Sequence, residues 1–191
     1  DFNIGSFDNC TSKNNLTYDS HDNLLNELSL SASTQGTNTV WNNSGNTIYT
    51  YDNNNNQTSS IYQYWNSQSN SWKTSSASTS TYNTNNLITQ EIYQSASSFT
   101  APLVNAFKYT YAYDIFNNPL LFQEYEWNSV TNAWDIVSKY NITASGNKIT
   151  AYVGYDWDAT TNSWINSVKG SMTYDASGNQ TSQTEQSWNT V

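Results

Sequence analysis

Few side chains in this sequence are of the types that usually carry out chemistry. His21 is the only histidine and Cys10 is the only cysteine. His21 lies beside a turn, and Cys10 has no neighbouring cysteine or histidine that would make it a nucleophile or a metal ligand. We therefore interpret His21 as a solvated turn residue and Cys10 as a plain strand residue, with an intersubunit disulfide as the lesser alternative.

The acidic residues suggest two further kinds of site, and the sequence supports neither of them. Glu124 and Glu126 lie near Trp127, which invites comparison with the paired carboxylates of glycosidases. The pair does not recur along the chain, so a polar sheet face is the better interpretation. Turn Asp and Asn residues lack the dense D-x-D-x-D spacing of a calcium loop. We expect no catalytic residue, no metal and no cofactor, and hence no enzyme.

Tyrosine and tryptophan are abundant, with 15 and 8 residues respectively. Rows of these rings can stack on sugars, as in a glycan-binding protein, or can form a core in place of leucine. Their position on the more apolar face of the predicted strands favours a core or a subunit contact. The aromatic residues that we expect to line the repeat are Tyr18, Trp41, Tyr51, Trp65, Trp72, Tyr113, Trp127, Trp134, Trp157, Trp164 and Tyr174.

These rings belong to a repeat of about 32 residues. The clearest copy, residues 164–179, has a Trp that opens a strand of about ten residues, then Tyr-Asp, then an Asp-x-x-Gly-Asn turn. The anchor positions, spaced by 33, 31, 31, 29 and 32 residues, are Tyr18, Tyr51, Tyr82, Tyr113, Ile142 and Tyr174. A fixed period of this length indicates a repeat protein.

Each copy contains one strand that ends in Tyr-Asp and a second strand after the turn. Apolar and polar residues alternate with a period of two over 103–113 and 121–127, and Trp164 and Tyr174 fall on one face by the same alternation. Tryptophans seven apart bracket a hairpin loop and should face each other. The sequence predicts an all-β antiparallel meander of about six two-stranded repeats, elongated or rolled into a sheet or sandwich, with an inner face lined by Trp and Tyr.

The turn after each Tyr-Asp has a local physical reason. Asp begins the turn by accepting hydrogen bonds from backbone amides, and Gly or Asn adopts the positive φ that a tight turn requires. At Tyr18-Asp19, Tyr51-Asp52, Tyr113-Asp114 and Tyr174-Asp175 the chain resembles the YD repeats of bacterial Rhs-type surface and secreted proteins. The resemblance implies a long antiparallel sheet that is architectural and has no catalytic site.

Charge excludes two classes of partner. The net charge is −9 and only six residues are basic, so the clustered Lys and Arg needed for nucleic-acid binding or for attraction to anionic membranes are missing. No apolar run approaches the ~18 residues of a membrane-spanning helix. The composition, rich in Asn, Ser, Thr and Tyr with 11% charged residues, is typical of exported bacterial surface proteins, so we expect an extracellular location.

We expect a single domain over residues 1–191, with 1–15 as an N-terminal strand and candidate intersubunit arm and 16–191 as the repeats. Unprotected edge strands invite pairing with another chain. We hypothesise a structural subunit of an extracellular filament or surface fibre that assembles head-to-tail with itself. The candidate residues for these contacts are Phe2, Ile4, Phe7, Trp188 and Val191. The alternative is a monomeric adhesin or carbohydrate-binding module that binds surface glycans through exposed Trp and Tyr.

Overall fold

The computed structural model describes residues 10–35, 38–98 and 100–188. These residues form twelve β-strands and the turns between them, and they include no helix of the length and apolar character needed to cross a membrane. The strands are β1 (Ser12–Tyr18), β2 (Leu24–Gln35), β3 (Asn38–Tyr51), β4 (Gln57–Asn66), β5 (Ser71–Tyr82), β6 (Ile88–Ala96), β7 (Leu103–Tyr113), β8 (Pro119–Asn128), β9 (Ala133–Ser145), β10 (Lys148–Asp158), β11 (Ser163–Tyr174) and β12 (Gln180–Ser187).

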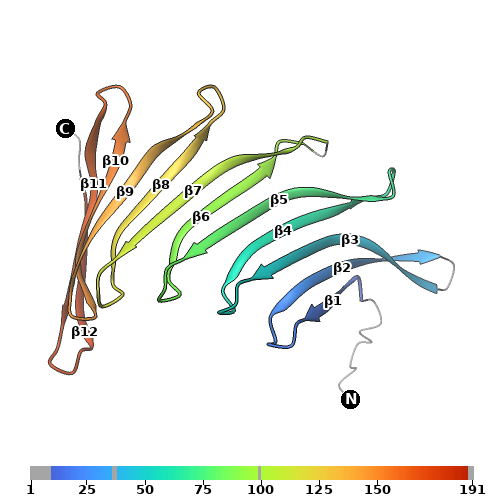
Figure 1. Cartoon of the computed structure of the whole chain (residues 1–191), viewed down its shortest axis with the longest axis horizontal. Coiled ribbons are helices and arrows are strands. Elements are labelled where there is room, and N and C mark those ends of the chain that lie inside the picture. Colours follow the sequence, from blue (N-terminus) through green and yellow to red (C-terminus); the bar gives the residue numbers. More distant parts are fainter. Residues whose placement is uncertain (1–9, 36–37, 99, 189–191) are drawn as a thin grey trace, which may run out of the picture. The chain divides into compact units, whose positions relative to one another are not determined.

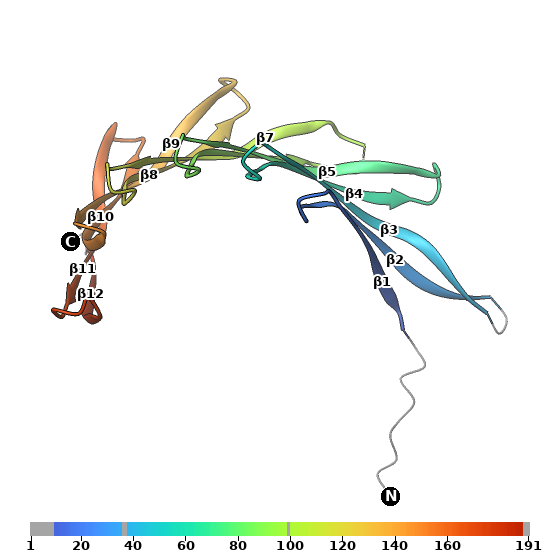
Figure 2. The ribbon, with the colours of Figure 1, turned by 60° about the horizontal axis from the view of Figure 1, so that its bottom comes forward.

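The strands form one antiparallel meander in which sheet order equals chain order, from β1 to β12. Figures 1 and 2 show each strand beside the one that follows it in the chain. β1 and β12 are the two edges of the sheet, which is not closed. The prediction of an all-β antiparallel meander of about twelve strands is therefore confirmed. By its internal contacts the chain divides into two compact units, one of residues 1–79 and 94–104 and one of residues 80–93 and 105–191.

The turns after Tyr-Asp are built by the Asp side chain. In the copy at Asp114, Oδ1 accepts hydrogen bonds from the backbone N–H groups of Phe116 and Asn118 at 2.8 and 2.9 Å, and Oδ2 accepts one from Asn118 Nδ2 at 2.8 Å. Asn117 takes the positive φ, 68°. The same arrangement occurs at Asp19, Asp52 and Asp175. The predicted capping role of these aspartates is confirmed.

Neighbouring turns are also bonded to each other. Asn23 Nδ2 donates to Asn55 Oδ1 at 2.9 Å, which joins two turns that are 32 residues apart. In the second unit Asn118 Nδ2 donates to the carbonyl oxygen of Gly146 at 2.6 Å, and Lys148 Nζ donates to that of Gly178. Asn118 is only 6% exposed as a result. The repeat thus continues its hydrogen bonding beyond the strands, along the row of turns.

A β-bulge recurs three residues after a tryptophan. The extra residues, which lie in β3, β5, β9 and β11, are Ser44, Ser75, Val137 and Ser167. An extra residue shifts the alternation by one position and moves the rest of the strand's side chains to the other face. Trp164 and Tyr174 therefore lie on opposite faces. The prediction that Trp and Tyr line one shared inner face is wrong for this reason.

The second unit consequently has two different faces. We call the face that carries Tyr109, Tyr140 and Tyr152 the Tyr face. We call the opposite face, which carries the tryptophans of β8 to β11, the Trp face. Pairing of Trp127 with Trp134 across the β8–β9 hairpin confirms that the paired tryptophans face each other.

Almost no side chain is fully enclosed in the described residues. Leu30, at 9% exposure, is their one buried hydrophobic side chain. The other enclosed positions include three strand glycines, Gly45, Gly154 and Gly170, over which tyrosine rings lie. Burial in this sheet is achieved by aromatic rings that cover backbone, so the rings themselves remain half-exposed.

The tyrosine of three Tyr-Asp pairs fastens the end of its strand to the start of the preceding strand. Tyr51, Tyr113 and Tyr174 donate hydrogen bonds to the carbonyl oxygens of Leu24, Ile88 and Ile149 at 3.0, 2.9 and 2.7 Å. The bonded carbonyl groups lie at or next to the start of β2, β6 and β10. This contact explains physically why a tyrosine recurs before the turn.

Replacing Tyr113 with phenylalanine should lower the free energy of unfolding by roughly 0.5–1.5 kcal/mol, because one hydrogen bond is lost while the ring stays in place. Urea denaturation followed by tryptophan fluorescence measures this change. Tyr62→Phe, on a ring that is 44% exposed, is the matched control and should have a smaller effect. Equal losses in the two variants would show that the bond of Tyr113 to Ile88 contributes nothing.

Candidate functional site

The Tyr face of the second unit carries a continuous row of aromatic rings from β6 to β10. The ring centroids of Tyr93 and Tyr109 are 5.7 Å apart in an edge contact, and those of Tyr109 and Phe122 are 5.7 Å apart in a stacked contact. The row continues from Phe122 to Tyr140 at 6.1 Å and from Tyr140 to Tyr152 at 6.3 Å. Cross-strand aromatic contacts of this kind stabilise a sheet beyond the area that they bury.

Two glycines determine how this row ends. A Cβ atom on Gly154 would lie 2.9 Å from Cε1 of Tyr140, and a Cβ atom on Gly170 would lie 2.3 Å from Cε1 of Tyr152. Each ring therefore lies directly on the backbone of the neighbouring strand, in space that any other residue would occupy. A glycine in a strand often marks such a close approach.

The carboxylates of the Tyr face accept hydrogen bonds from hydroxyl groups around them. Glu91 accepts from Tyr111 at 2.8 Å and from Tyr93 at 3.2 Å. Burial, together with the hydrogen bond to Glu91 and its negative charge, raises the pKa of Tyr111. Glu185 accepts from the hydroxyl of Tyr152. These carboxylates are thus held among aromatic rings at fixed positions.

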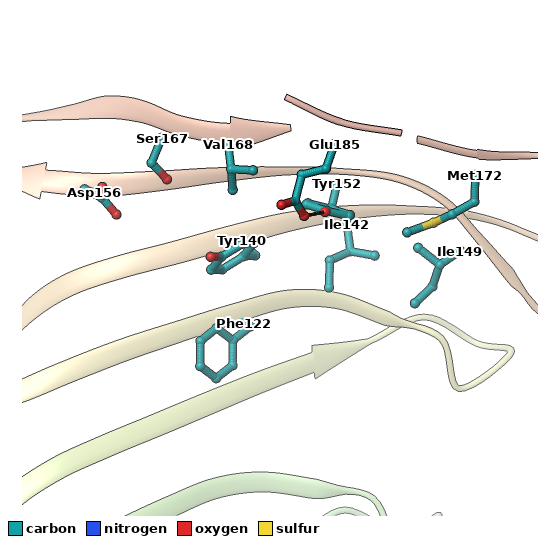
Figure 3. A pocket seen from close by; sticks show the side chains of 10 residues that line it. All are labelled: Phe122, Tyr140, Ile142, Ile149, Tyr152, Asp156, Ser167, Val168, Met172 and Glu185. Atoms are coloured by element: carbon teal, nitrogen blue, oxygen red, sulfur yellow. Dashed lines mark hydrogen bonds between the residues drawn. The ribbon is translucent and has the colours of Figure 1, made fainter. Parts of the chain in front are cut away.

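A groove of about 700 Å³ lies on the Tyr face towards β12. Figure 3 shows the rings of Phe122, Tyr140 and Tyr152 along it, with the carboxylate of Glu185 bonded to Tyr152. Its apolar lining consists of Ile142, Ile149, Val168 and Met172, and its polar lining includes Asp156 and Ser167. The arrangement combines aromatic, aliphatic and anionic groups in one concave surface.

The Trp face carries lysines among its aromatic rings, where the Tyr face carries carboxylates. The Trp127–Trp134 and Trp157–Trp164 pairs meet edge to face, with centroids 5.0 and 5.1 Å apart. Lys139 Nζ lies 4.2 Å from the ring centroid of Trp164. These are distances at which a cation is attracted by an aromatic ring.

A second lysine of the Trp face, Lys108, lies 3.9 Å from the ring centroid of Tyr125. Burial lowers the pKa of Lys108. A second groove, of about 780 Å³, runs beside the hairpin tips at Trp127, Trp134 and Trp157. The lysines of this face are therefore engaged with the face's own rings.

The family model described as "Family of unknown function (DUF3836)" matches residues 77–175. The chain belongs to the DUF3836 family. The matched stretch includes Tyr113-Asp114 and Tyr174-Asp175, and the resemblance to YD repeats is therefore wrong. The motif was misleading because Tyr-Asp before a turn is favoured by local hydrogen bonds, which many unrelated hairpins can use.

Three solved structures are similar to this DUF3836 chain. A DUF3836 family protein from Bacteroides vulgatus is 20% identical, covers 48% of this chain and 89% of its own, and has a TM-score of 0.40. A DUF3836 family protein from Parabacteroides distasonis is 12% identical, covers 47% and 84%, and has a TM-score of 0.38. A porin-like protein from Bacteroides uniformis is 14% identical, covers 86% and 54%, and has a TM-score of 0.38. No curated protein matches the chain.

Several residues singled out from the sequence of this DUF3836 protein can now be placed. Phe2, Ile4, Phe7 and Val191 lie outside the described residues. Trp188 is 49% exposed and follows β12, with its ring 5.7 Å from Lys169 Nζ. Tyr18 is 51% exposed on β1, and the ring of Trp41 lies 4.7 Å from Lys13 Nζ.

The residues first considered for chemistry are also dispersed. The backbone N–H of His21 donates to Asp19 Oδ1 at 2.8 Å, and the Cys10 thiol donates to the carbonyl oxygen of Ser12 at 2.9 Å. Both side chains are exposed. No three His, Cys, Asp or Glu residues come together as a metal site in the part of the chain that the structure describes.

The groove and the different charges of the two faces were not predicted from the sequence. Lys108, Lys139 and Lys169 recur at intervals of 31 and 30 residues, and this period was the one signal that could have placed them together. The residues that line the groove could not be assigned to one face from the sequence, because each bulge reverses the alternation of faces partway along a strand.

Proposed function

We propose that this DUF3836 protein is a structural, non-enzymatic component of the bacterial cell exterior that joins other copies edge to edge by β-strand pairing. The observation that carries the proposal is that β12 is exposed and pairs on one side only. All residues of Gln180–Ser187 are exposed, and β11 is the one strand that pairs with β12 among the described residues. Glu185 is the single charged residue of β12, which contains no proline. An edge of this kind is a template for another strand.

The opposite edge supports the same interpretation. β1 is exposed over its whole length, Ser12–Tyr18, and Lys13 is its one charged residue. Lys13 is directed to the ring of Trp41, and Glu185 to the hydroxyl of Tyr152. Both edge charges therefore make contacts within the sheet, where they do little to repel an approaching strand.

The hydrogen-bond pattern of β12 identifies a residue with which to test this proposal. The backbone N–H of Trp188 donates to the carbonyl oxygen of Ser167 in β11 at 2.7 Å. Backbone groups alternate in direction along an antiparallel strand. The N–H of Gln183, an odd number of residues away, is therefore expected to point to the open edge.

Replacing Gln183 with proline should abolish assembly, because proline removes an N–H donor from the open edge of β12. The N–H groups with which β12 bonds β11 are unchanged. Negative-stain electron microscopy and sedimentation velocity should show fibres or oligomers for the wild type and monomers for the variant. Gln183→Ser keeps the N–H group and is the matched control, which should assemble normally. A wild-type protein that stays monomeric at high concentration would refute edge pairing.

A second function, glycan binding by an adhesin, is favoured by the exposure of rings on the Tyr face. Tyr93 is 38% exposed and Phe107 is 41% exposed, and both lie on one face of the sheet. Exposed rings on a flat surface can stack on sugars. A glycan array distinguishes this function from assembly, since glycan binding requires these rings and not the N–H of Gln183.

A further inference from the structure

We propose that the groove on the Tyr face binds a linear aliphatic polyamine. This inference does not depend on edge-to-edge assembly, because the groove uses side chains on the Tyr face of the second unit, whereas strand pairing would use the backbone groups of β12. The volume of the groove and the charge and spacing of the groups that line it favour this ligand.

The groove has the size and lining of a small-molecule site. Its volume of about 700 Å³ falls within the usual range of roughly 300–1,000 Å³ for such sites. Methylene groups of a ligand would lie against Ile142, Ile149 and Met172. The rings of Phe122 and Tyr140 offer faces that attract ammonium groups.

The charge of this face selects a cation. In the second unit the strand carboxylates other than the turn-capping aspartates lie on the Tyr face: Glu91, Glu124, Glu126, Asp135, Asp156 and Glu185. Of the four lysines within its strands, Lys108, Lys139 and Lys169 lie on the Trp face. The fourth, Lys148, donates to the carbonyl oxygen of Gly178 in a turn, and its Nζ lies 4.7 Å from the ring centroid of Tyr174. Six carboxylates therefore share the Tyr face with the amino group of Lys148, which is not among the residues that line the groove. The net negative potential over the groove favours a cationic ligand and would repel an anionic one.

The spacing of two carboxylates indicates a long ligand. Asp156 in β10 pairs with Ile165 of β11, whereas Glu185 in β12 pairs with Gly170 of the same strand. Two strand spacings across the sheet and about four residues along it place their Cα atoms roughly 16 Å apart. An extended tetraamine such as spermine has about this reach, and its aliphatic segments would cross the apolar lining between the two carboxylates.

A lysine-bearing face of a second copy is a weaker candidate for the same position. The amino groups of Lys108 and Lys139 lie 3.9 and 4.2 Å from ring centroids of their own face. Docking into the groove would require them to leave these rings. A free polyamine has no such contacts to break.

Isothermal titration of the intact protein with spermine at low salt tests the proposal. We expect saturable binding of one spermine per chain that weakens as salt is added. The double variant Asp156→Asn, Glu185→Gln should bind at least about tenfold more weakly, which corresponds to the loss of two charge contacts. Glu27→Gln is the matched control, because Glu27 is a strand carboxylate of the first unit and lies outside the groove.

Three results would overturn the proposal. The first is the absence of binding at millimolar spermine. The second is an equal loss of affinity in the double variant and in Glu27→Gln, which would indicate unspecific attraction to an acidic protein. The third is equal competition by Mg²⁺ at matched ionic strength, since Mg²⁺ has charge but no aliphatic chain to occupy the apolar lining.

Discussion

Replacing Gly170 with valine is expected to lower the free energy of unfolding by about 1–3 kcal/mol. The new Cβ atom would lie 2.3 Å from Cε1 and 2.4 Å from Cζ of Tyr152. The ring can escape only by leaving the backbone that it covers and the carboxylate of Glu185 that it bonds. Urea denaturation measures the loss, and a parallel spermine titration reports whether the groove is disturbed.

The effect of Gly170→Val on the free energy of unfolding should change sign when the ring of Tyr152 is absent. In a Tyr152→Ala background, valine at position 170 meets no ring, and valine is a better strand residue than glycine. Gly170→Val should then be neutral or stabilising. A double-mutant cycle isolates this coupling. An equal cost in both backgrounds would mean that contact with Tyr152 is not what requires a glycine at this position.

Acid should destabilise the Tyr-Asp turns together. The hydrogen bonds from Asn118 to Asp114 hold the pKa of this carboxyl below its ordinary value of 3.8, and the pKa values of Asp19, Asp52 and Asp175 are lowered by the equivalent asparagines. A lowered folded-state pKa stabilises the fold above the unfolded value, and this contribution is lost as pH falls through the folded value. The urea midpoint should therefore be steady above about pH 5 and fall below about pH 4.

Asp114→Asn separates this effect from general acid denaturation. Asn83 shows that an asparagine can hold such a turn, because its Oδ1 accepts from the N–H groups of Asn85 and Leu87 at 2.9 and 3.0 Å. The variant should be less stable than wild type at neutral pH, since the carboxylate bond from Asn118 Nδ2 is lost. The difference in stability between wild type and variant should shrink as pH falls, because Asp114 of the wild type becomes protonated. A difference that is constant with pH would contradict this assignment.

Local features of this fold were predictable from sequence because their causes are local. The Tyr-Asp turns depend on side chains within five residues of one another, as at Asp114 and Asn118. Alternation and the tryptophan pairs placed the hairpins correctly, because both follow from the period of two along a strand. Length and period together gave the number of strands.

The faces could not be predicted because a bulge has no strong signature in residue type. Ser44, Ser75, Val137 and Ser167 are ordinary strand residues, and each reverses the alternation that follows it. The groove depends on this reversal, since Val168 and Met172 reach the Tyr face only because Ser167 is the extra residue. A glycine within a strand can have several causes, so the sequence alone does not predict that tyrosine rings cover Gly154 and Gly170.

The agreement between sheet order and chain order has an evolutionary consequence. Each strand pairs only with the strands immediately before and after it in the chain. Duplicating or deleting one copy of about 32 residues would therefore lengthen or shorten the sheet while every remaining strand keeps a partner of the same kind. We expect chains built on this plan to differ from one another in the number of copies, with changes concentrated at whole two-stranded units.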